Sequence, residues 1–148
     1  MSASVQILLI DDDRAWRETV SEYLRDQGFA VATAEGPRLG QALLEETDPL
    51  VAVIDYQMPE MDGLQLLRRL RRRRRDLSVL LLSSEENPAL AARALDEGAL
   101  AFLSKNTPPR QLLRKLLQVL VGALIEATMR RLLARRDARL LPSPRGAA

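Results

Sequence analysis

Five short apolar stretches alternate along the chain with stretches in which apolar residues recur every three or four positions. The apolar stretches cover residues 5–10, 29–34, 50–54, 77–82 and 100–104. The intervening spacing predicts helices over residues 14–27, 37–46, 64–75 and 88–97. Strands that alternate regularly with helices form parallel sheets covered on both faces. The pattern therefore predicts a doubly wound α/β domain with five parallel strands.

The apolar spacing after Pro108 continues further than the last helix of such a domain requires. A helix of about 12–15 residues is long enough to cover one side of a small sheet. Here the pattern continues for another ten residues or so, until Pro142 and Pro144 stop it. We therefore expect a domain over residues 4–121, a helical extension over residues 122–141 and a disordered tail over residues 142–148.

Composition removes several classes of chemistry. The chain contains no cysteine and no histidine, which excludes disulfides, thiolate or imidazole metal ligands, histidine-based triads and a phosphohistidine on this chain. No stretch approaches the roughly 20 apolar residues that span a bilayer, and the first residues lack the apolar core of a signal peptide. These features favour a soluble, cytoplasmic protein with no membrane partner.

Charge is distributed unevenly. Residues 1–105 contain 13 Lys or Arg against 18 Asp or Glu, whereas residues 106–148 contain 9 against 2. The predicted domain is therefore acidic and the C-terminal segment basic. Only two of the basic residues, Lys105 and Lys115, are lysines.

Polar residues follow four of the predicted strands at the point where each strand ends. Asp11 and Asp12 follow the first, Asp55 the third, Ser83 the fourth and Lys105 the fifth. Because the carboxyl ends of parallel strands meet at one edge of the sheet, these side chains should converge there. Three adjacent carboxylates repel one another unless a cation lies between them. Mg²⁺, which prefers oxygen ligands and phosphate, is the expected cation.

Four segments in this order resemble the receiver domain of two-component response regulators. They are the acidic-pair strand end at residues 7–13, the strand and MP-x-MDG loop at residues 53–63, the hydroxyl strand at residues 79–84 and the aromatic-and-lysine strand at residues 98–105. The resemblance covers about residues 4–121. It implies a flavodoxin-like sheet with strand order 2-1-3-4-5.

The resemblance also implies roles for individual residues. Asp55 would accept a phosphoryl group from a histidine kinase or a phosphotransfer protein. Asp12 and Asp55 would ligate Mg²⁺ directly, Asp11 would act through water, and the backbone carbonyl of Gln57 would be a further ligand. The protein would not be an enzyme, apart from self-catalysed phosphotransfer and autodephosphorylation.

Ser83 and Lys105 would bind the phosphoryl oxygens, and movement of Ser83 would let Phe102 swing inward as a switch. Taken singly, each of these residues has a more ordinary interpretation. An acidic pair is usually a solvated turn or a helix cap, and Asp13 is expected to cap the first helix. Phe102 is as consistent with a core position as with a switch, because it lacks the hydroxyl of the Tyr common in the family.

Two positions depart from the family pattern. Arg14 stands where proline is common, which changes the start of the first helix without affecting the ligands. Asn106 follows Lys105, where the family has a proline that is often preceded by a cis bond. A cis bond before a non-proline residue costs about 3–4 kcal/mol. We therefore expect a trans bond and a shifted loop at this position.

A haloacid-dehalogenase-type phosphatase is a rival interpretation, because Asp11-x-Asp13, Ser83 and Lys105 also occur in that order. Such enzymes need an acidic pair at a strand end after the lysine, and only Glu126 and Asp137 follow it. We reject this interpretation because it also leaves Asp55 unexplained.

The arginine run at residues 68–75 is expected to be a solvated helix end, with an acidic partner surface or polyanion attraction as alternatives. Specific DNA binding is not expected, since about 25 residues beyond the receiver cannot form a helix-turn-helix output domain. The apolar residues of the extension predict homodimerisation, with folding back on the domain or docking to another protein as alternatives. Five of them carry this prediction: Leu124, Ile125, Met129, Leu132 and Leu133.

Two functions remain open at this stage. The first is a single-domain response regulator that signals through dimerisation or an unknown downstream protein. The second is a receiver-fold oligomeric scaffold whose assembly does not depend on phosphorylation.

Overall fold

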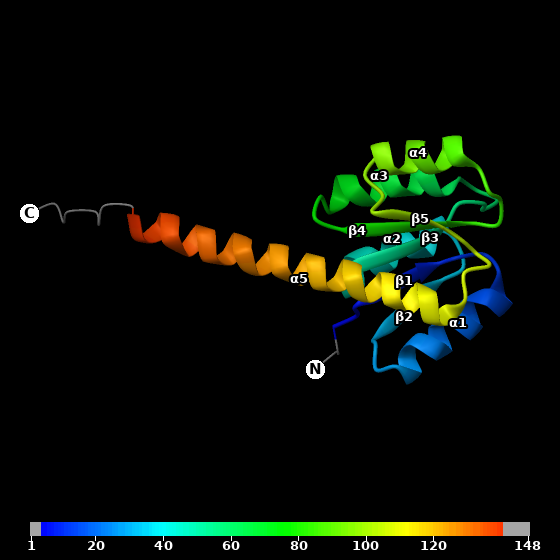
Figure 1. The fold of residues 1–148 in the computed structure, drawn as a ribbon, viewed down its shortest axis with the longest axis horizontal. Coiled ribbons are helices and arrows are strands. Elements are labelled where there is room, and N and C mark those ends of the chain that lie inside the picture. Colours follow the sequence, from blue (N-terminus) through cyan, green and yellow to red (C-terminus); the bar gives the residue numbers. More distant parts are fainter. Residues whose placement is uncertain (1–3, 141–148) are drawn as a thin grey trace, which may run out of the picture.

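A computed structural model describes residues 4–140 of the chain. Five parallel strands form one sheet in the order β2-β1-β3-β4-β5, which confirms the predicted flavodoxin-like topology (Figure 1). The strands are β1 (Ile7–Ile10), β2 (Val31–Ala34), β3 (Val51–Asp55), β4 (Ser78–Ser83) and β5 (Ala101–Ser104).

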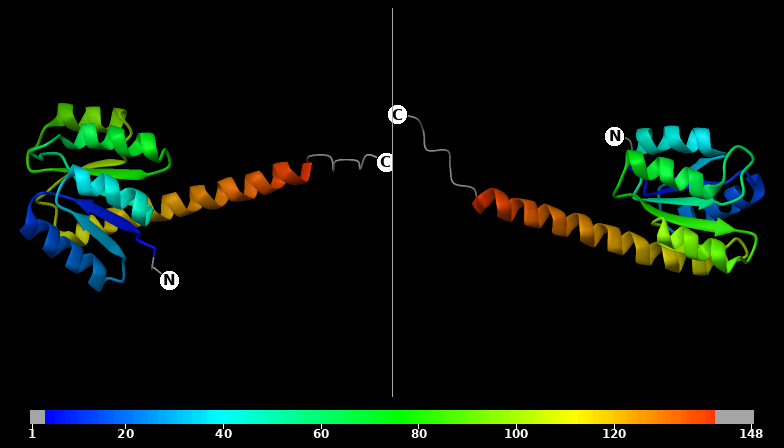
Figure 2. Two further views of the ribbon diagram at one scale, coloured as in Figure 1. Left: turned by 180° about the vertical axis from the view of Figure 1, so that it is seen from behind. Right: turned by 90° about the horizontal axis from the view of Figure 1, so that it is seen from above.

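Five helices cover the two faces of this sheet (Figure 2). They are α1 (Arg14–Asp26), α2 (Pro37–Thr47), α3 (Gly63–Arg73), α4 (Pro88–Asp96) and α5 (Pro109–Leu140). Core residues of α1 and α5 pack on one face, and core residues of α2, α3 and α4 pack on the other. The tail predicted over residues 142–148 lies outside the described residues.

The uniformly apolar strands follow from this two-sided burial. Along β1, Ile7 and Leu9 join the core beneath α1 and α5, whereas Leu8 and Ile10 join the core beneath α2, α3 and α4. All four side chains are fully buried. A strand with this composition can only be central, and β1 lies between β2 and β3.

The helix ends carry the expected caps. The Asp13 side chain caps α1 by accepting a hydrogen bond from the backbone of Trp16 at 3.1 Å. Gly28 closes the same helix with φ of 97°, a conformation that glycine adopts without strain. The strand predicted over residues 29–34 begins only at Val31, because Phe29 still donates to Leu24 O in the closing turn of α1.

The arginine run at residues 68–75 is less solvated than expected, because parts of it brace neighbouring loops. Arg71 donates to the carbonyl of Gly98 at 3.0 Å, and Arg74 donates to the carbonyl of Pro49. These contacts tie the end of α3 to the turns before β5 and β3. Packing between layers has therefore given a structural role to residues that the sequence suggested were solvated.

Helix α5 passes beyond the sheet and projects away from the domain as one continuous helix to Leu140 (Figures 1 and 2). Leu112, Leu116, Val119 and Leu120 bury its first turns against the domain. The remaining 20 residues would extend about 30 Å at the usual helical rise. The structure therefore contradicts the alternative that the extension folds back on the domain. Among the helices of residues 4–140, none is long and apolar enough to cross a membrane.

Candidate functional site

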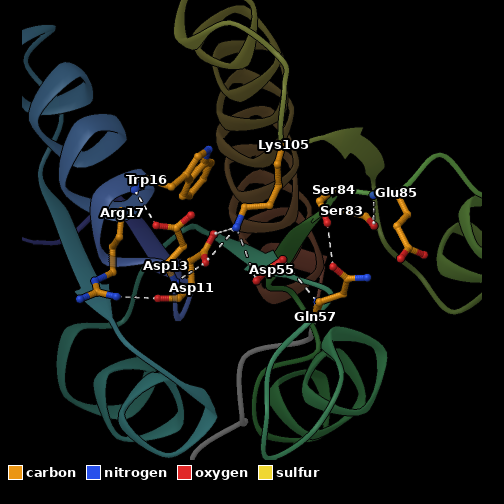
Figure 3. Close-up of polar contacts among 10 residues, drawn as sticks. All are labelled: Asp11, Asp13, Trp16, Arg17, Asp55, Gln57, Ser83, Ser84, Glu85 and Lys105. Carbon is orange, nitrogen blue, oxygen red and sulfur yellow. Dashed lines mark hydrogen bonds and ion pairs between the residues drawn. The ribbon is translucent and has the colours of Figure 1, made fainter.

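The polar residues predicted to converge do meet at one edge of the sheet (Figure 3). In the parallel register, Ile10 pairs with Ile54, so that Asp11 and Asp55 emerge side by side from β1 and β3. On the other side of β3, the end of β4 supplies Ser83, which pairs with the end of β5 just before Lys105.

Three carboxylates form the centre of this edge. Asp11, Asp12 and Asp55 each offer an oxygen atom, and these oxygens all lie within 4.8 Å of one another. Asp11 and Asp55 are buried, at 1% and 3% exposure, whereas Asp12 is exposed. The cluster is thus buried on the side of Asp11 and Asp55 and reaches solvent on the side of Asp12.

The surroundings of Asp55 raise the pKa of its carboxyl group. Burial, followed by the negative charge of Asp11, raises the pKa of Asp55 to about 7. The Lys105 ammonium and the backbone N–H of Gln57, which donates to Asp55 Oδ1 at 3.3 Å, act in the opposite direction. The strand end therefore holds a carboxylate that needs a further positive charge to ionise readily at neutral pH.

Lys105 supplies one positive charge to the cluster. Its ammonium lies 2.9 Å from Asp11 Oδ2 and 3.6 Å from Asp55 Oδ2. Burial lowers the pKa of Lys105, but the hydrogen bond to Asp11 and the charges of both carboxylates outweigh it, so that the pKa is raised overall. Lys105 is therefore a fixed cation that belongs to Asp11 more closely than to Asp55.

The donor set fits a divalent cation with oxygen ligands. The lysine ammonium donates a hydrogen bond to Asp11 Oδ1 at 3.1 Å, whereas the buried Oδ2 accepts no hydrogen bond despite its shorter distance. One lysine cannot neutralise three clustered carboxylates. Carboxylate oxygens without nitrogen or sulfur donors are the ligands that Mg²⁺ prefers.

The hydroxyl side of the site is also ordered by hydrogen bonds. Ser83 is buried, and its Oγ accepts a hydrogen bond from the backbone N–H of Glu85 at 3.1 Å. Ser84 Oγ donates to Gln57 Oε1 at 2.7 Å and so links the loop after β4 to the loop after β3. Sequence reasoning assigned a role only to the backbone of Gln57, and this side-chain bridge was not predicted.

Phe102 lies on β5 and is half-buried. Its side chain packs against the core cluster beneath α2, α3 and α4. This contact is what the core interpretation predicts. The inward movement of Phe102 stays a prediction.

Two residues of α1 belong to the site although sequence reasoning missed them. Arg17 donates to the backbone carbonyl of Asp11 at 2.7 Å and holds the strand end. The Lys105 ammonium lies 5.3 Å from the centroid of the Trp16 ring (Figure 3). The capping role predicted for Asp13 could have signalled both contacts, because it places the first turn of α1 beside the strand ends.

The peptide bond between Lys105 and Asn106 is trans, as expected, and no cis bond occurs within residues 4–140. The backbone N–H of Lys105 donates to the Ser83 carbonyl at 2.9 Å, so the lysine remains attached to the end of β4. Proline is therefore not required here to hold Lys105 at the site.

Comparison with known proteins agrees with this geometry. The model of the response regulator receiver domain matches residues 7–117, and the chain belongs to this family. Receiver domains are the phosphoacceptor domains of two-component response regulators. These domains interact with histidine kinases or phosphotransfer proteins, and they are generally not enzymes.

Individual relatives include longer proteins. The chain is 35% identical to the response regulator MprA of Mycolicibacterium vanbaalenii over 112 residues, covering 76% of this chain and 48% of that protein. It is 37% identical over 137 residues to the C4-dicarboxylate transport transcriptional regulatory protein DctD of Pseudomonas aeruginosa, covering 90% of this chain and 30% of that protein. The chain thus spans about half or less of the length of these curated relatives.

Among solved structures, a CheY-like receiver domain protein from Methanospirillum hungatei superposes with a TM-score of 0.79 at 27% identity. The match covers 84% of this chain and 99% of that one. This chain is therefore longer than that receiver.

Proposed function

We propose that Asp55 accepts a phosphoryl group from the phosphohistidine of a kinase or phosphotransfer protein. Asp55 suits this role because it is buried at the end of a central strand, 3.6 Å from a fixed ammonium and beside two further carboxylates. An oxygen of Asp55 would bond to phosphorus as the P–N bond of the donor breaks, and the electron pair would remain on the imidazole nitrogen. Phosphoryl transfer of this kind depends mainly on positioning and charge neutralisation.

Asp12 and Asp55 would hold Mg²⁺ directly, with Asp11 acting through water and the Gln57 carbonyl as a further ligand. The metal would neutralise charge on the phosphoryl oxygens and on the carboxylates. Asp11 is suited to a role at the metal site because its buried Oδ2 accepts no hydrogen bond and could accept one from a metal-bound water. Solvent access beside Asp12 leaves the phosphoryl donor an approach.

Ser83 and Lys105 would bind the phosphoryl oxygens once the group is transferred. Ser83 Oγ now accepts a hydrogen bond from Glu85 N–H, and its hydroxyl proton is free to be donated to an oxygen on Asp55. Such a bond would draw the β4 end toward Asp55 and leave room for Phe102 to move inward. The charge of the phosphoryl group would thereby shift Phe102 from its outward to its inward position.

Mg²⁺-dependent binding of beryllofluoride, a mimic of the phosphoryl group, tests this assignment. Calorimetric titration of the full chain should detect binding only with Mg²⁺ present, and Asp55→Asn should abolish it. Asp62→Asn is the matched control, because Asp62 is a half-buried helix cap outside the carboxylate cluster and asparagine caps equally well. Binding that survives in Asp55→Asn, or that needs no Mg²⁺, would contradict the proposal.

We infer that the projecting part of α5 pairs with the same helix of a second copy of this chain. A row of seven apolar residues, each between 43% and 58% exposed, follows one side of the helix. They are Leu117, Val121, Leu124, Ile125, Met129, Leu132 and Leu133. Four of the six steps between them are three or four residues, as in the seam of a coiled coil.

A second copy is the partner that best suits this row. Helices in proteins gain most of their stability from packing of an apolar face, and no other element of residues 4–140 covers this row. A second α5 offers an identical row of the same length, so that a two-fold pair would bury both at once.

Light scattering on Leu124→Glu and Leu132→Glu tests the pairing. Both variants should be monomers, whereas Ala134→Glu should remain a dimer, because Ala134 is exposed but lies on the opposite side of the helix by its 3.6-residue period. Monomeric wild-type protein at all accessible concentrations would contradict the dimer.

The same measurement separates regulated signalling from a constitutive scaffold. We expect beryllofluoride with Mg²⁺ to strengthen association of the wild-type chain and to leave Asp55→Asn unchanged. Equal association in every state would favour the receiver-fold scaffold, whose assembly does not depend on phosphorylation. A downstream partner would then bind the dimer rather than the phosphorylated face.

A further inference from the structure

Trp16 makes the one cation–π contact found within residues 4–140, and its partner is the functional lysine. We propose that Trp16 is a positioning residue for the phosphoacceptor site, whose indole face holds the Lys105 ammonium beside Asp55. This proposal rests on the phosphoacceptor function proposed above for Asp55.

The fold places the two side chains together from opposite ends of the sequence. Trp16 occupies the first turn of α1, fixed there by the hydrogen bond from its backbone to the Asp13 cap. Lys105 follows β5, the strand at the far side of the sheet from β2. A groove of about 370 Å³ separates α1 from the loop before α5, and both side chains line it.

The Lys105 ammonium lies between the carboxylates of Asp11 and Asp55 and the indole ring of Trp16 (Figure 3). Carboxylate oxygens of Asp11 and Asp55 lie at 2.9 and 3.6 Å, and the indole ring lies at 5.3 Å from its centroid. The Lys105 side chain is only 14% exposed, so that water competes weakly for the contact. Among the aromatic side chains, tryptophan attracts a cation most strongly.

The indole of Trp16 can hold the Lys105 ammonium without neutralising its charge, which a carboxylate cannot do. A metal held by Asp11 through water would draw on the same carboxylate that anchors the ammonium, and would therefore weaken the strongest anchor of Lys105. The indole is not a metal ligand and carries no net charge. Its contact with the ammonium can therefore persist when the metal binds, without neutralising the positive charge that the phosphoryl group needs.

Replacing Trp16 should weaken binding of a phosphoryl mimic more than binding of the metal. Beryllofluoride requires the ammonium near Asp55, and a cation–π contact of this kind corresponds to roughly a 3- to 10-fold change in affinity. Trp16→Leu should lose this factor, and Trp16→Phe, which keeps an aromatic face, should lose less. Mg²⁺ affinity alone should change by less than about twofold, because Trp16 contributes no ligand.

Tyr23→Leu is the matched control. Tyr23 lies two turns further along α1, is half-buried like Trp16 and packs against the same core cluster. A loss of affinity caused only by weaker packing of α1 would appear equally in Tyr23→Leu. A loss caused by the contact with Lys105 would appear only in the Trp16 variants.

The lysine content of the chain gives a direct spectroscopic measurement. Lys105 and Lys115 are its only lysines, so ¹³C-labelled lysine should give two sets of side-chain methylene NMR signals. The protons nearest the Lys105 ammonium should be shifted upfield by the Trp16 ring, and those of Lys115 should not. Trp16→Leu should remove this shift, Trp16→Phe should retain part of it, and Tyr23→Leu should leave it unchanged.

Two results would overturn the proposal. The first is equal beryllofluoride affinity in wild type, Trp16→Phe and Trp16→Leu. The second is a wild-type Lys105 signal without an upfield shift. Failure of the underlying function is distinguishable, because wild-type protein would then bind no beryllofluoride with Mg²⁺ whatever the lysine signals show. If Trp16→Leu does not fold, Trp16→Phe still tests the ring with a core-filling aromatic side chain.

Discussion

The ammonium of Lys105 lies 2.9 Å from Asp11 Oδ2, a buried oxygen that nevertheless accepts no hydrogen bond. Lysine and metal therefore compete for the same carboxylate. Because the second Asp11 oxygen does accept from the ammonium, at 3.1 Å, the lysine is ordered before any metal binds. A divalent cation bound beside Asp11 would therefore weaken the contact between Asp11 and the Lys105 ammonium.

Replacement of Asp11 by asparagine should weaken metal binding. The Asp11→Asn variant would keep the side-chain volume but remove one of three negative charges. We expect its Mg²⁺ affinity to fall by roughly tenfold or more, because ligand charge sets affinity in such sites. A titration of Mg²⁺ followed by the fluorescence of the single tryptophan measures this loss. Asp13→Asn, which retains the helix cap, should change the affinity by less than about twofold.

The raised pKa of Asp55, about 7, makes metal binding dependent on pH. Below pH 7, Mg²⁺ must displace a proton from Asp55, so that its affinity should rise between about pH 6 and 8 and level off above. Asp55→Asn should lose this dependence. Isothermal titration at several pH values measures it, and a flat profile in wild-type protein would contradict the assignment of the raised pKa to Asp55.

The same pKa predicts how stability depends on pH without metal. Between its unfolded value of 3.8 and about 7, Asp55 binds a proton in the folded state but not in the unfolded one. The contribution of Asp55 to the free energy of unfolding is therefore fully present below about pH 4 and is lost as the pH rises through 7. Asp55→Asn should raise the midpoint of thermal unfolding at pH 8 by roughly 3–6 °C, have a smaller effect at pH 5 and have little effect at pH 4. Added Mg²⁺ should narrow the difference at pH 8.

Gly63 should tolerate no side chain, because the loop after β3 passes too close to it. A Cβ at this position would lie 2.8 Å from the Asp55 carbonyl oxygen and 2.9 Å from Tyr56 Cα. Gly63→Ala should therefore cost about 1–3 kcal/mol of stability and displace Asp55, with weaker beryllofluoride binding. Gly36→Ala is the control, since Gly36 has nothing within 4 Å of its Cβ position. It should leave beryllofluoride binding unchanged and cost less than about 1 kcal/mol, from the poorer N-cap of α2. Urea unfolding and calorimetric titration provide the two measurements.

Arg74 should contribute measurably to stability although it belongs to an arginine run. It donates to the Pro49 carbonyl and forms an ion pair with Asp48 at 2.7 Å. Arg74→Ala would leave a partly buried carbonyl without its donor, at a cost of about 1–2 kcal/mol in urea unfolding. Arg75→Ala, the neighbouring position in the run, should cost less than about 0.5 kcal/mol. Equal effects at both positions would mean that charge alone matters.

Site membership could be predicted from the sequence because it follows from local chemistry, whereas the strand order was implied by the resemblance to receiver domains. An apolar strand such as residues 7–10 can only be buried on two faces, and polar residues at strand ends must then share an edge. Asp11, Asp12, Asp55, Ser83 and Lys105 were found in this way. Strand limits were less accurate, as at β2, where a hydrogen bond from Phe29 to the end of α1 delays the start of the strand.

The fold class, the convergence of the charged residues and the length of the last helix all follow from the sequence alone, because periodicity and strand-end polarity are local properties. Which groups touch one another depends on the packing of the folded chain. Several contacts join segments that are distant in sequence. Lys105 lies nearer to Asp11 than to Asp55 and also contacts Trp16. Arg71 and Arg74 hydrogen-bond to the loops before β5 and β3. Such contacts depend on how layers pack and on rotamers within them, and no spacing along the chain encodes either.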